Sequence, residues 1–110
     1  MRVAVLGLGE AGARIAADLV AAGVDVRGFD PVSRPAGIGL AESAAAAVVD
    51  TDVVVSVNAA SVALAVAETV AASLPRGSLY ADFNTASPSL KRELAEAVPV
   101  AFADVALVGV

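Results

Sequence analysis

Cysteine, histidine and tryptophan are all absent from this sequence of 110 residues. Without cysteine there is no disulfide framework and no thiolate nucleophile, and without histidine there is no imidazole base. A zinc site would also lack its usual ligands. Any chemistry must therefore come from carboxylates, hydroxyls, amides, lysine or a bound cofactor.

Basic residues are few, because seven lysines and arginines stand against twelve acidic residues and give a net charge of -5. They are spread singly except for Lys91 and Arg92, so no basic stripe could neutralise a nucleic-acid backbone. The longest uncharged run, from Val53 to Ala67, is polar in places and shorter than the ~20 residues of a membrane span. We expect a cytoplasmic protein that binds neither nucleic acid nor a membrane.

Aromatic residues make up only 4% of the chain, although 58% of it is hydrophobic. The core must therefore consist of alanine, valine and leucine, whose small side chains suit helices packed closely on a sheet. A chain of this length forms one domain. Its last residues, Leu107 to Val110, are apolar and uncharged, so we expect residues 1–110 to be a domain truncated from a longer chain.

Strand patterns and helix patterns alternate along the chain. Apolar β-branched runs predict strands, and apolar residues at helical spacing predict helices. Strands are expected at 3–6, 24–29, around 38, and at 53–57, 78–83 and 100–107, and helices at 10–22, 43–49, 60–74 and 88–98. The run from Val53 to Val57 is typical of a strand near the centre of a parallel sheet. The alternation predicts an α/β protein, a three-layer Rossmann fold with a doubly wound parallel sheet of about six strands.

Six residues between the first predicted strand and helix match the pattern G-x-G-x-x-G. They are Gly7, Leu8, Gly9, Glu10, Ala11 and Gly12. Gly7 allows a tight turn, Gly9 lets the backbone approach a pyrophosphate, and Gly12 lets the helix pack against the strand. The helix N-terminus offers N–H groups and a positive dipole end to phosphate, and we expect Glu10 to point to solvent. Taken alone, the pattern fits a simple tight turn equally well.

An acidic residue follows where a dinucleotide site needs one. Asp30 lies 18 residues after Gly12 at the end of the second predicted strand, where it can accept hydrogen bonds from an adenosine ribose. An Asp before Pro31 is also a good turn former, so both roles are open. The carboxylate would repel a 2′-phosphate, whereas Arg34 either faces such a phosphate or is a solvated surface residue. We expect NAD or NADP as the cofactor, with NAD preferred.

Three segments of the chain resemble the β-hydroxyacid dehydrogenase superfamily, which includes 3-hydroxyisobutyrate and 6-phosphogluconate dehydrogenases and imine reductases. They are Val5 to Gly12, Asp52 to Val57, and Asp82 to Pro88. The last segment looks like the family stretch D-x-S/N-T-x-S-P and is more specific than the glycine loop. The resemblance implies the cofactor domain of an NAD(P)-dependent oxidoreductase, which transfers hydride between a nicotinamide and a small hydroxyacid-like or imine-like substrate.

The resemblance also implies which residues lie near the nicotinamide. Asn84 and Thr85 would stand there, at the end of a central strand, or else turn and cap the next helix. Asn58, after the strand at 53–57, would contact the cofactor or cap the helix that follows. Family members take their catalytic lysine from a helix beyond this domain. Lys91 is expected on an exposed helix face, so no residue of this chain is assigned to catalysis.

One stretch departs from the family pattern D-A-P-V-S-G-G, whose serine and glycines help to hold the substrate. Val108 stands at the serine position and Val110 at the second glycine, which argues against the usual hydroxyacid substrate. The departure favours a second interpretation, a non-catalytic nucleotide-sensing Rossmann domain. A third, an S-adenosylmethionine methyltransferase, disagrees with the dinucleotide spacing and with residues 84–88. In the enzyme, a C-terminal helical domain would complete the pocket for a small-molecule substrate, and the parent protein would be a homo-oligomer.

Overall fold

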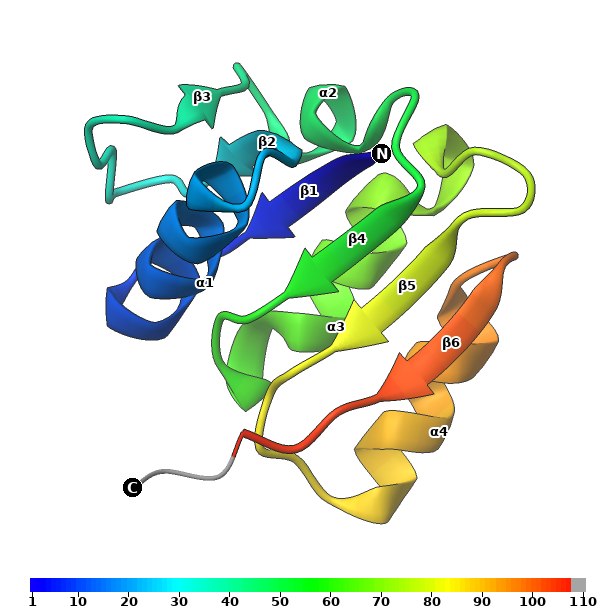
Figure 1. Ribbon diagram of the computed structural model, residues 1–110. Coiled ribbons are helices and arrows are strands. Elements are labelled where there is room, and N and C mark those ends of the chain that lie inside the picture. Colours follow the sequence, from blue (N-terminus) through cyan, green and yellow to red (C-terminus); the bar gives the residue numbers. More distant parts are fainter. Residues whose placement is uncertain (108–110) are drawn as a thin grey trace.

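The computed structural model describes residues 1–107, and these form one parallel sheet with helices on both faces (Figure 1). The strands are β1 (Arg2–Leu6), β2 (Asp25–Phe29), β3 (Gly39–Leu40), β4 (Val53–Ser56), β5 (Leu79–Asp82) and β6 (Ala101–Asp104). The order across the sheet is β3-β2-β1-β4-β5-β6. The chain therefore changes direction of winding between β1 and β4, which is the arrangement of a doubly wound Rossmann fold and confirms the predicted architecture.

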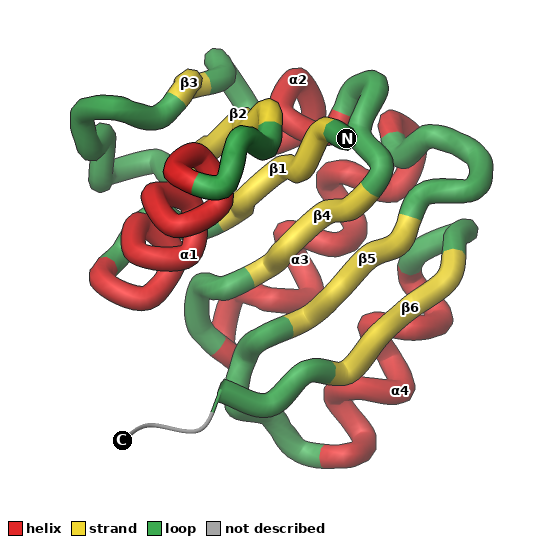
Figure 2. The backbone as a smooth tube through the Cα atoms, in the orientation of Figure 1, coloured by secondary structure: helices red, strands yellow, loops and turns green. Residues whose placement is uncertain are grey.

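Four α-helices cover the sheet. They are α1 (Glu10–Ala21), α2 (Ala44–Val48), α3 (Ala60–Val70) and α4 (Pro88–Ala97). Figure 2 shows α1 on one face of the sheet and the other three helices on the opposite face, which makes three layers. None of the helices among residues 1–107 has the length and apolarity that a membrane crossing requires.

The strands of the sheet centre carry the core on both of their faces. Within β1, Val5 packs beneath α1, whereas Leu6 faces the helices of the other side. In β4, Val54 and Val55 divide in the same way, and both are buried. Because each face of these strands is covered, their sequences are continuously apolar instead of alternating. This confirms that the run beginning at Val53 lies near the sheet centre.

The helix ends follow their sequence signals. Ser87 caps α4 by accepting a hydrogen bond from Leu90 N at 3.2 Å, and Pro88 occupies the first turn. Gly23 follows α1 with a φ of +86°, a conformation that glycine adopts without strain. All three residues have the roles that the sequence predicted.

Two elements end three or more residues before their sequence patterns do. The helix expected over 60–74 is α-helical only to Val70 and tightens into a 3₁₀ turn, Ala71–Ser73. The strand expected over 100–107 ends at Asp104, because its neighbour β5 ends at Asp82 and offers no further partner strand. Residues 105–107 follow as a loop.

Candidate functional site

The glycine loop joins β1 to α1, and its three glycines have different surroundings. Gly7 has a φ of +103°, and a Cβ added there would lie 2.2 Å from the carbonyl oxygen of Val57. A Cβ at Gly12 would lie 1.8 Å from the carbonyl oxygen of Gly7. At Gly9, by contrast, such an atom would meet nothing within 4 Å. Packing therefore requires Gly7 and Gly12, whereas Gly9 borders open space.

The N-terminus of α1 opens onto this space. No side chain caps this helix end, and Ala13 N, which donates to Gly9 O at 2.8 Å, makes its first internal hydrogen bond. The N–H groups of Glu10, Ala11 and Gly12 consequently have no partner within the helix. Glu10 is exposed, as expected, and its negative charge in the first turn interacts favourably with the positive end of the helix dipole. These N–H groups and the dipole can together bind an anion such as a pyrophosphate.

Asp30 follows β2, and both of its carboxylate oxygens are bound to backbone N–H groups. Oδ2 accepts from Leu8 N, and Oδ1 accepts from Val32 N and Ser33 N, each at 2.8 Å. Burial raises the pKa of this carboxyl, but the hydrogen bonds from Ser33, Leu8 and Val32 outweigh burial and hold the pKa below its ordinary value. Asp30 therefore forms the turn that the sequence allowed, and it also ties that turn to the glycine loop.

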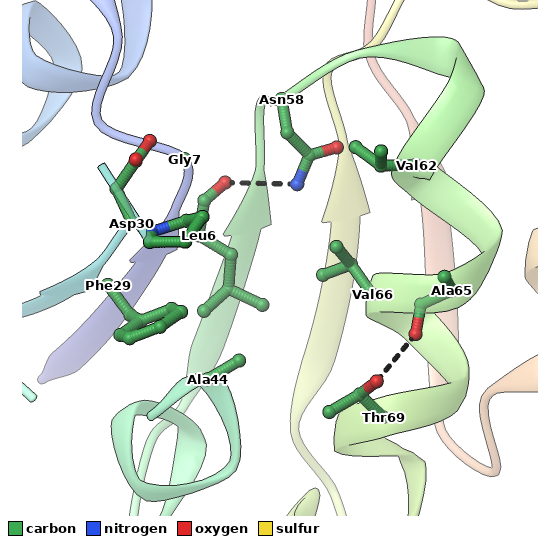
Figure 3. Close-up of a pocket in the computed structure, with 11 residues that line it drawn as sticks. Leu6, Gly7, Phe29, Asp30, Ala44, Asn58, Val62, Ala65, Val66 and Thr69 are labelled. Atoms are coloured by element: carbon green, nitrogen blue, oxygen red, sulfur yellow. Dashed lines mark hydrogen bonds between the residues drawn. The ribbon is translucent and has the colours of Figure 1, made fainter. Parts of the chain in front are cut away.

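A cavity of about 360 Å³ begins beside Asp30 and runs between the sheet and α3. In Figure 3, Phe29 and Ala44 stand on one side of it and Val62 and Val66 of α3 on the other. Val62 is 45% exposed, because it borders this space instead of the closed core. A mostly apolar cavity with a carboxylate at its mouth can hold a flat ring that carries a hydroxyl-bearing group.

Asn58 and Asn84 lie at the ends of β4 and β5 and bind one another. Asn58 N donates to Asn84 Oδ1 at 2.7 Å, and Asn84 Nδ2 donates to Asn58 Oδ1 at 3.1 Å. Ser87 caps α4, so Asn84 does not cap that helix. Asn58 Oδ1 also accepts from the N–H of Ala59, the residue before α3, at 3.1 Å, so Asn58 contributes to the helix entrance while the two amides bridge neighbouring strand ends.

Lys91 was expected on an exposed helix face, and this prediction is wrong. The residue is only 9% exposed, and its Nζ lies 2.7 Å from Asp82 Oδ2 and 2.6 Å from Asp104 Oδ1. Lys91 precedes Leu94 by three residues, so both share the inner face of α4. The sequence signal that could have revealed this is Asp82, which stands two residues after Tyr80 and therefore on the same face of the strand. Both residues are fully buried, and a buried carboxylate needs a partner such as a lysine.

A second cavity, also of about 360 Å³, lies over the ends of β5 and β6. Its lining includes Asn84, Thr85, Lys91 and Asp104. Arg34 is far from this group in sequence and is exposed in the loop between β2 and β3. The structure thus brings Asn58, Asn84 and Thr85 together at the carboxyl ends of β4 and β5.

The expectations for Val108 and Val110 lie outside the described residues. The described chain reaches Leu107, which lines the second cavity.

Comparisons with known proteins agree with this geometry. A family model described as the NAD binding domain of 6-phosphogluconate dehydrogenase matches residues 2–110. A solved 3-hydroxyisobutyrate dehydrogenase from Mycobacterium tuberculosis is 33% identical, with a TM-score of 0.91, 98% of this chain covered and 40% of that chain. An imine reductase variant from Myxococcus stipitatus, solved with NAD+, is 24% identical with a TM-score of 0.85, covering 98% and 40% of the two chains.

A search of curated proteins finds no match. The chain spans about 40% of the length of the two solved relatives. The family model covers nearly all of the chain. The chain therefore belongs to the family of NAD binding domains of 6-phosphogluconate dehydrogenase.

Proposed function

We propose that this domain holds a nicotinamide dinucleotide, preferably NAD, for an oxidoreductase that acts on a small hydroxyacid-like or imine-like substrate. The observation that carries the proposal is the open space at Gly9 beside the uncapped N-terminus of α1. One cavity is lined by Asp30 and Gly7, and a second by Asn84. When bound, the cofactor supplies or accepts the hydride.

The adenosine half would lie in the cavity beside Asp30. A carboxylate has about four acceptor positions, and backbone N–H groups fill three of those on Asp30. The remaining position, on Oδ2, can accept a hydrogen bond from a ribose hydroxyl. Its neighbours hold this carboxylate ionised, so it would repel a 2′-phosphate, and this repulsion supports NAD over NADP. Arg34 is then a solvated surface residue.

The pyrophosphate would lie over Gly9. No side chain occupies this position, so the backbone can approach the phosphates closely. The N–H groups of Glu10, Ala11 and Gly12 would donate to the phosphate oxygens, and the helix dipole adds a favourable charge interaction. The N–H of Leu8 is bound to Asp30, so Leu8 supports the loop geometry and leaves the phosphates to its neighbours.

The nicotinamide half would lie on the other side of the strand-order switch, at the ends of β4 and β5. Asn58 and Asn84 shape this edge through their mutual hydrogen bonds. Thr85 follows directly and is exposed, so its hydroxyl can contact the ring or its amide. A further domain would close the substrate pocket and supply the acid or base, because the lysine at this edge is paired with two carboxylates.

A non-catalytic nucleotide sensor is a second candidate. The observation that favours it is that Lys91, the basic side chain in the second cavity, is bound by Asp82 and Asp104. The two candidates share the binding site and differ in what the parent protein adds to it. A cytoplasmic location and a homo-oligomeric parent stay predictions for either.

Isothermal titration calorimetry of the purified domain with NADH and with NADPH tests the proposal. We expect saturable binding of NADH and weaker binding of NADPH. Failure to bind either nucleotide would overturn the proposed function. Tighter binding of NADPH would assign the cofactor choice to Arg34 in place of Asp30. Assays of the parent protein with an imine and a 3-hydroxyacid then separate the enzyme from the sensor.

A further inference from the structure

Three oxygen atoms surround the Lys91 ammonium group. Nζ donates to the carbonyl oxygen of Asp82 at 3.2 Å and to Asp82 Oδ2 at 2.7 Å, and it forms an ion pair with Asp104 Oδ1 at 2.6 Å. The protein's own carboxylates therefore neutralise this ammonium group. Lys91 therefore joins the end of β5 to the end of β6, and both of these ends border the second cavity.

A chain of hydrogen bonds leads from Lys91 to the loop before α3. Asp82 binds Lys91 through Oδ2 and accepts from Asn84 Nδ2 at 2.8 Å through Oδ1. Asn84 Oδ1 in turn accepts from Asn58 N at 2.7 Å. Asp82 is fully buried and Asn84 is 6% exposed, so the chain is shielded from water and its bonds are strong. One cation on α4 thus orients polar groups on two strand ends.

We propose that Lys91 is a positioning residue for the nicotinamide half of the cofactor. Through Asp82 it holds Asn84 and the adjacent Thr85, and through Asp104 it holds the end of β6. This inference rests on the proposed function, since it takes the second cavity as the nicotinamide site. The alternative is a purely structural ion pair. Buried ion pairs are weak contributors to stability compared with apolar contacts, so stability alone does not explain a lysine on the inner face of α4.

The test compares NADH with ADP-ribose, which has the same adenosine and pyrophosphate but no nicotinamide. We expect the wild-type domain to bind NADH more tightly than ADP-ribose. In Lys91→Met, NADH should bind about tenfold more weakly, a loss like that caused by removing the outer hydrogen-bond partners of metal-binding residues. ADP-ribose should bind as before. A purely structural role would weaken both ligands alike.

Lys91→Met leaves Asp82 buried without its cation, and this variant is at risk of not folding. The double variant Lys91→Met with Asp82→Asn removes both charges and keeps an oxygen acceptor for Asn84. No unpaired charge is buried in this variant, so it allows the test if the single variant does not fold. Arg92→Met, at the exposed neighbouring position on α4, is the matched control and should bind both ligands as the wild type does. Lys91→Arg should restore part of the preference for NADH.

The outcomes separate this inference from the proposed function. If the wild type binds neither NADH nor ADP-ribose, the proposed function fails. If the wild type binds both equally, or the folded Lys91 variants lose affinity for both in the same proportion or for neither, the positioning role fails while the nucleotide site stands. Hydrogen exchange gives a second readout, because the N–H of Asn58 should exchange faster in the variants while those of β1 stay protected.

Discussion

The carboxylate of Asp30 accepts a hydrogen bond of 2.8 Å from the backbone N–H of Leu8, so the acid after β2 and the glycine loop after β1 form one unit. The two residues lie 22 positions apart in the chain. Their contact aligns the cavity beside Asp30 with the open space at Gly9. A ligand that spans both would meet groups already held in place, which lowers the ordering cost of binding.

Replacement of Asp30 by alanine should weaken NADH binding about tenfold, because hydrogen bonds to a charged group contribute on the order of 1.5–3 kcal/mol. The preference for NADH over NADPH should narrow, because the repulsion of the 2′-phosphate is lost. Calorimetry with both nucleotides measures the two effects. Asp18→Ala, which removes an exposed carboxylate from α1, serves as the control. Unchanged NADH affinity in Asp30→Ala would refute a ribose contact.

Replacement of Gly9 by valine should abolish binding of NADH and of ADP-ribose while the fold persists. The new side chain would project into the space that we assign to the pyrophosphate, where no protein atom lies within 4 Å of the added Cβ. Circular dichroism and calorimetry measure fold and binding on the same sample. Ala17→Val, at an exposed position of α1, introduces the same side chain away from the loop and should bind normally. A Gly9→Val variant with wild-type affinity would place the phosphates elsewhere.

Gly12→Ala should act on the fold instead. Glycine to alanine within a helix normally stabilises by about 1 kcal/mol. Here the new Cβ would lie 1.8 Å from the carbonyl oxygen of Gly7, and overpacking of this kind costs roughly 1–3 kcal/mol or more. Urea unfolding followed by circular dichroism should show a net loss of stability. A gain would mean that β1 and α1 can move apart at little cost.

Stability should fall between about pH 10 and pH 12 because of Tyr80. Burial raises the pKa of this phenol to about 12, whereas it is about 10 in the unfolded chain. The raised pKa means that the folded state keeps its proton while the unfolded state loses it, so the contribution is complete below pH ~10 and is lost as pH rises toward 12. Two pKa units correspond to about 2.7 kcal/mol.

Tyr80 is the chain's sole tyrosine, so the ultraviolet absorbance of tyrosinate reports on it alone. Its appearance should have a midpoint near pH 12 or coincide with alkaline unfolding. In Tyr80→Phe, the decrease in the free energy of unfolding at alkaline pH should be smaller by about 2.7 kcal/mol than in the wild type. Other groups should account for the remaining decrease. A tyrosinate midpoint near 10 in the folded protein would contradict the burial of the phenol.

The secondary-structure elements and the position of the phosphate loop could be predicted from local features of the sequence. Apolar runs, helical spacing and the end signals at Gly23 and Ser87 are local features, and each predicted its element within a few residues. Three glycines between a strand and a helix, with Asp30 at the next strand end, likewise need no tertiary contact to be recognised. These features are determined locally because backbone conformation and helix capping depend on near neighbours.

Which polar groups meet depends on how the elements pack together. Spacing along α4 could not show that Lys91 faces inward, since its partner Asp82 lies on another element and β6 brings Asp104 to the other side. The pairing of Asn58 with Asn84 likewise depends on β4 and β5 being neighbours with matched ends. Strand order and register bring such residues together, and they arise from burying the apolar faces of the whole sheet. No short stretch of sequence contains that information.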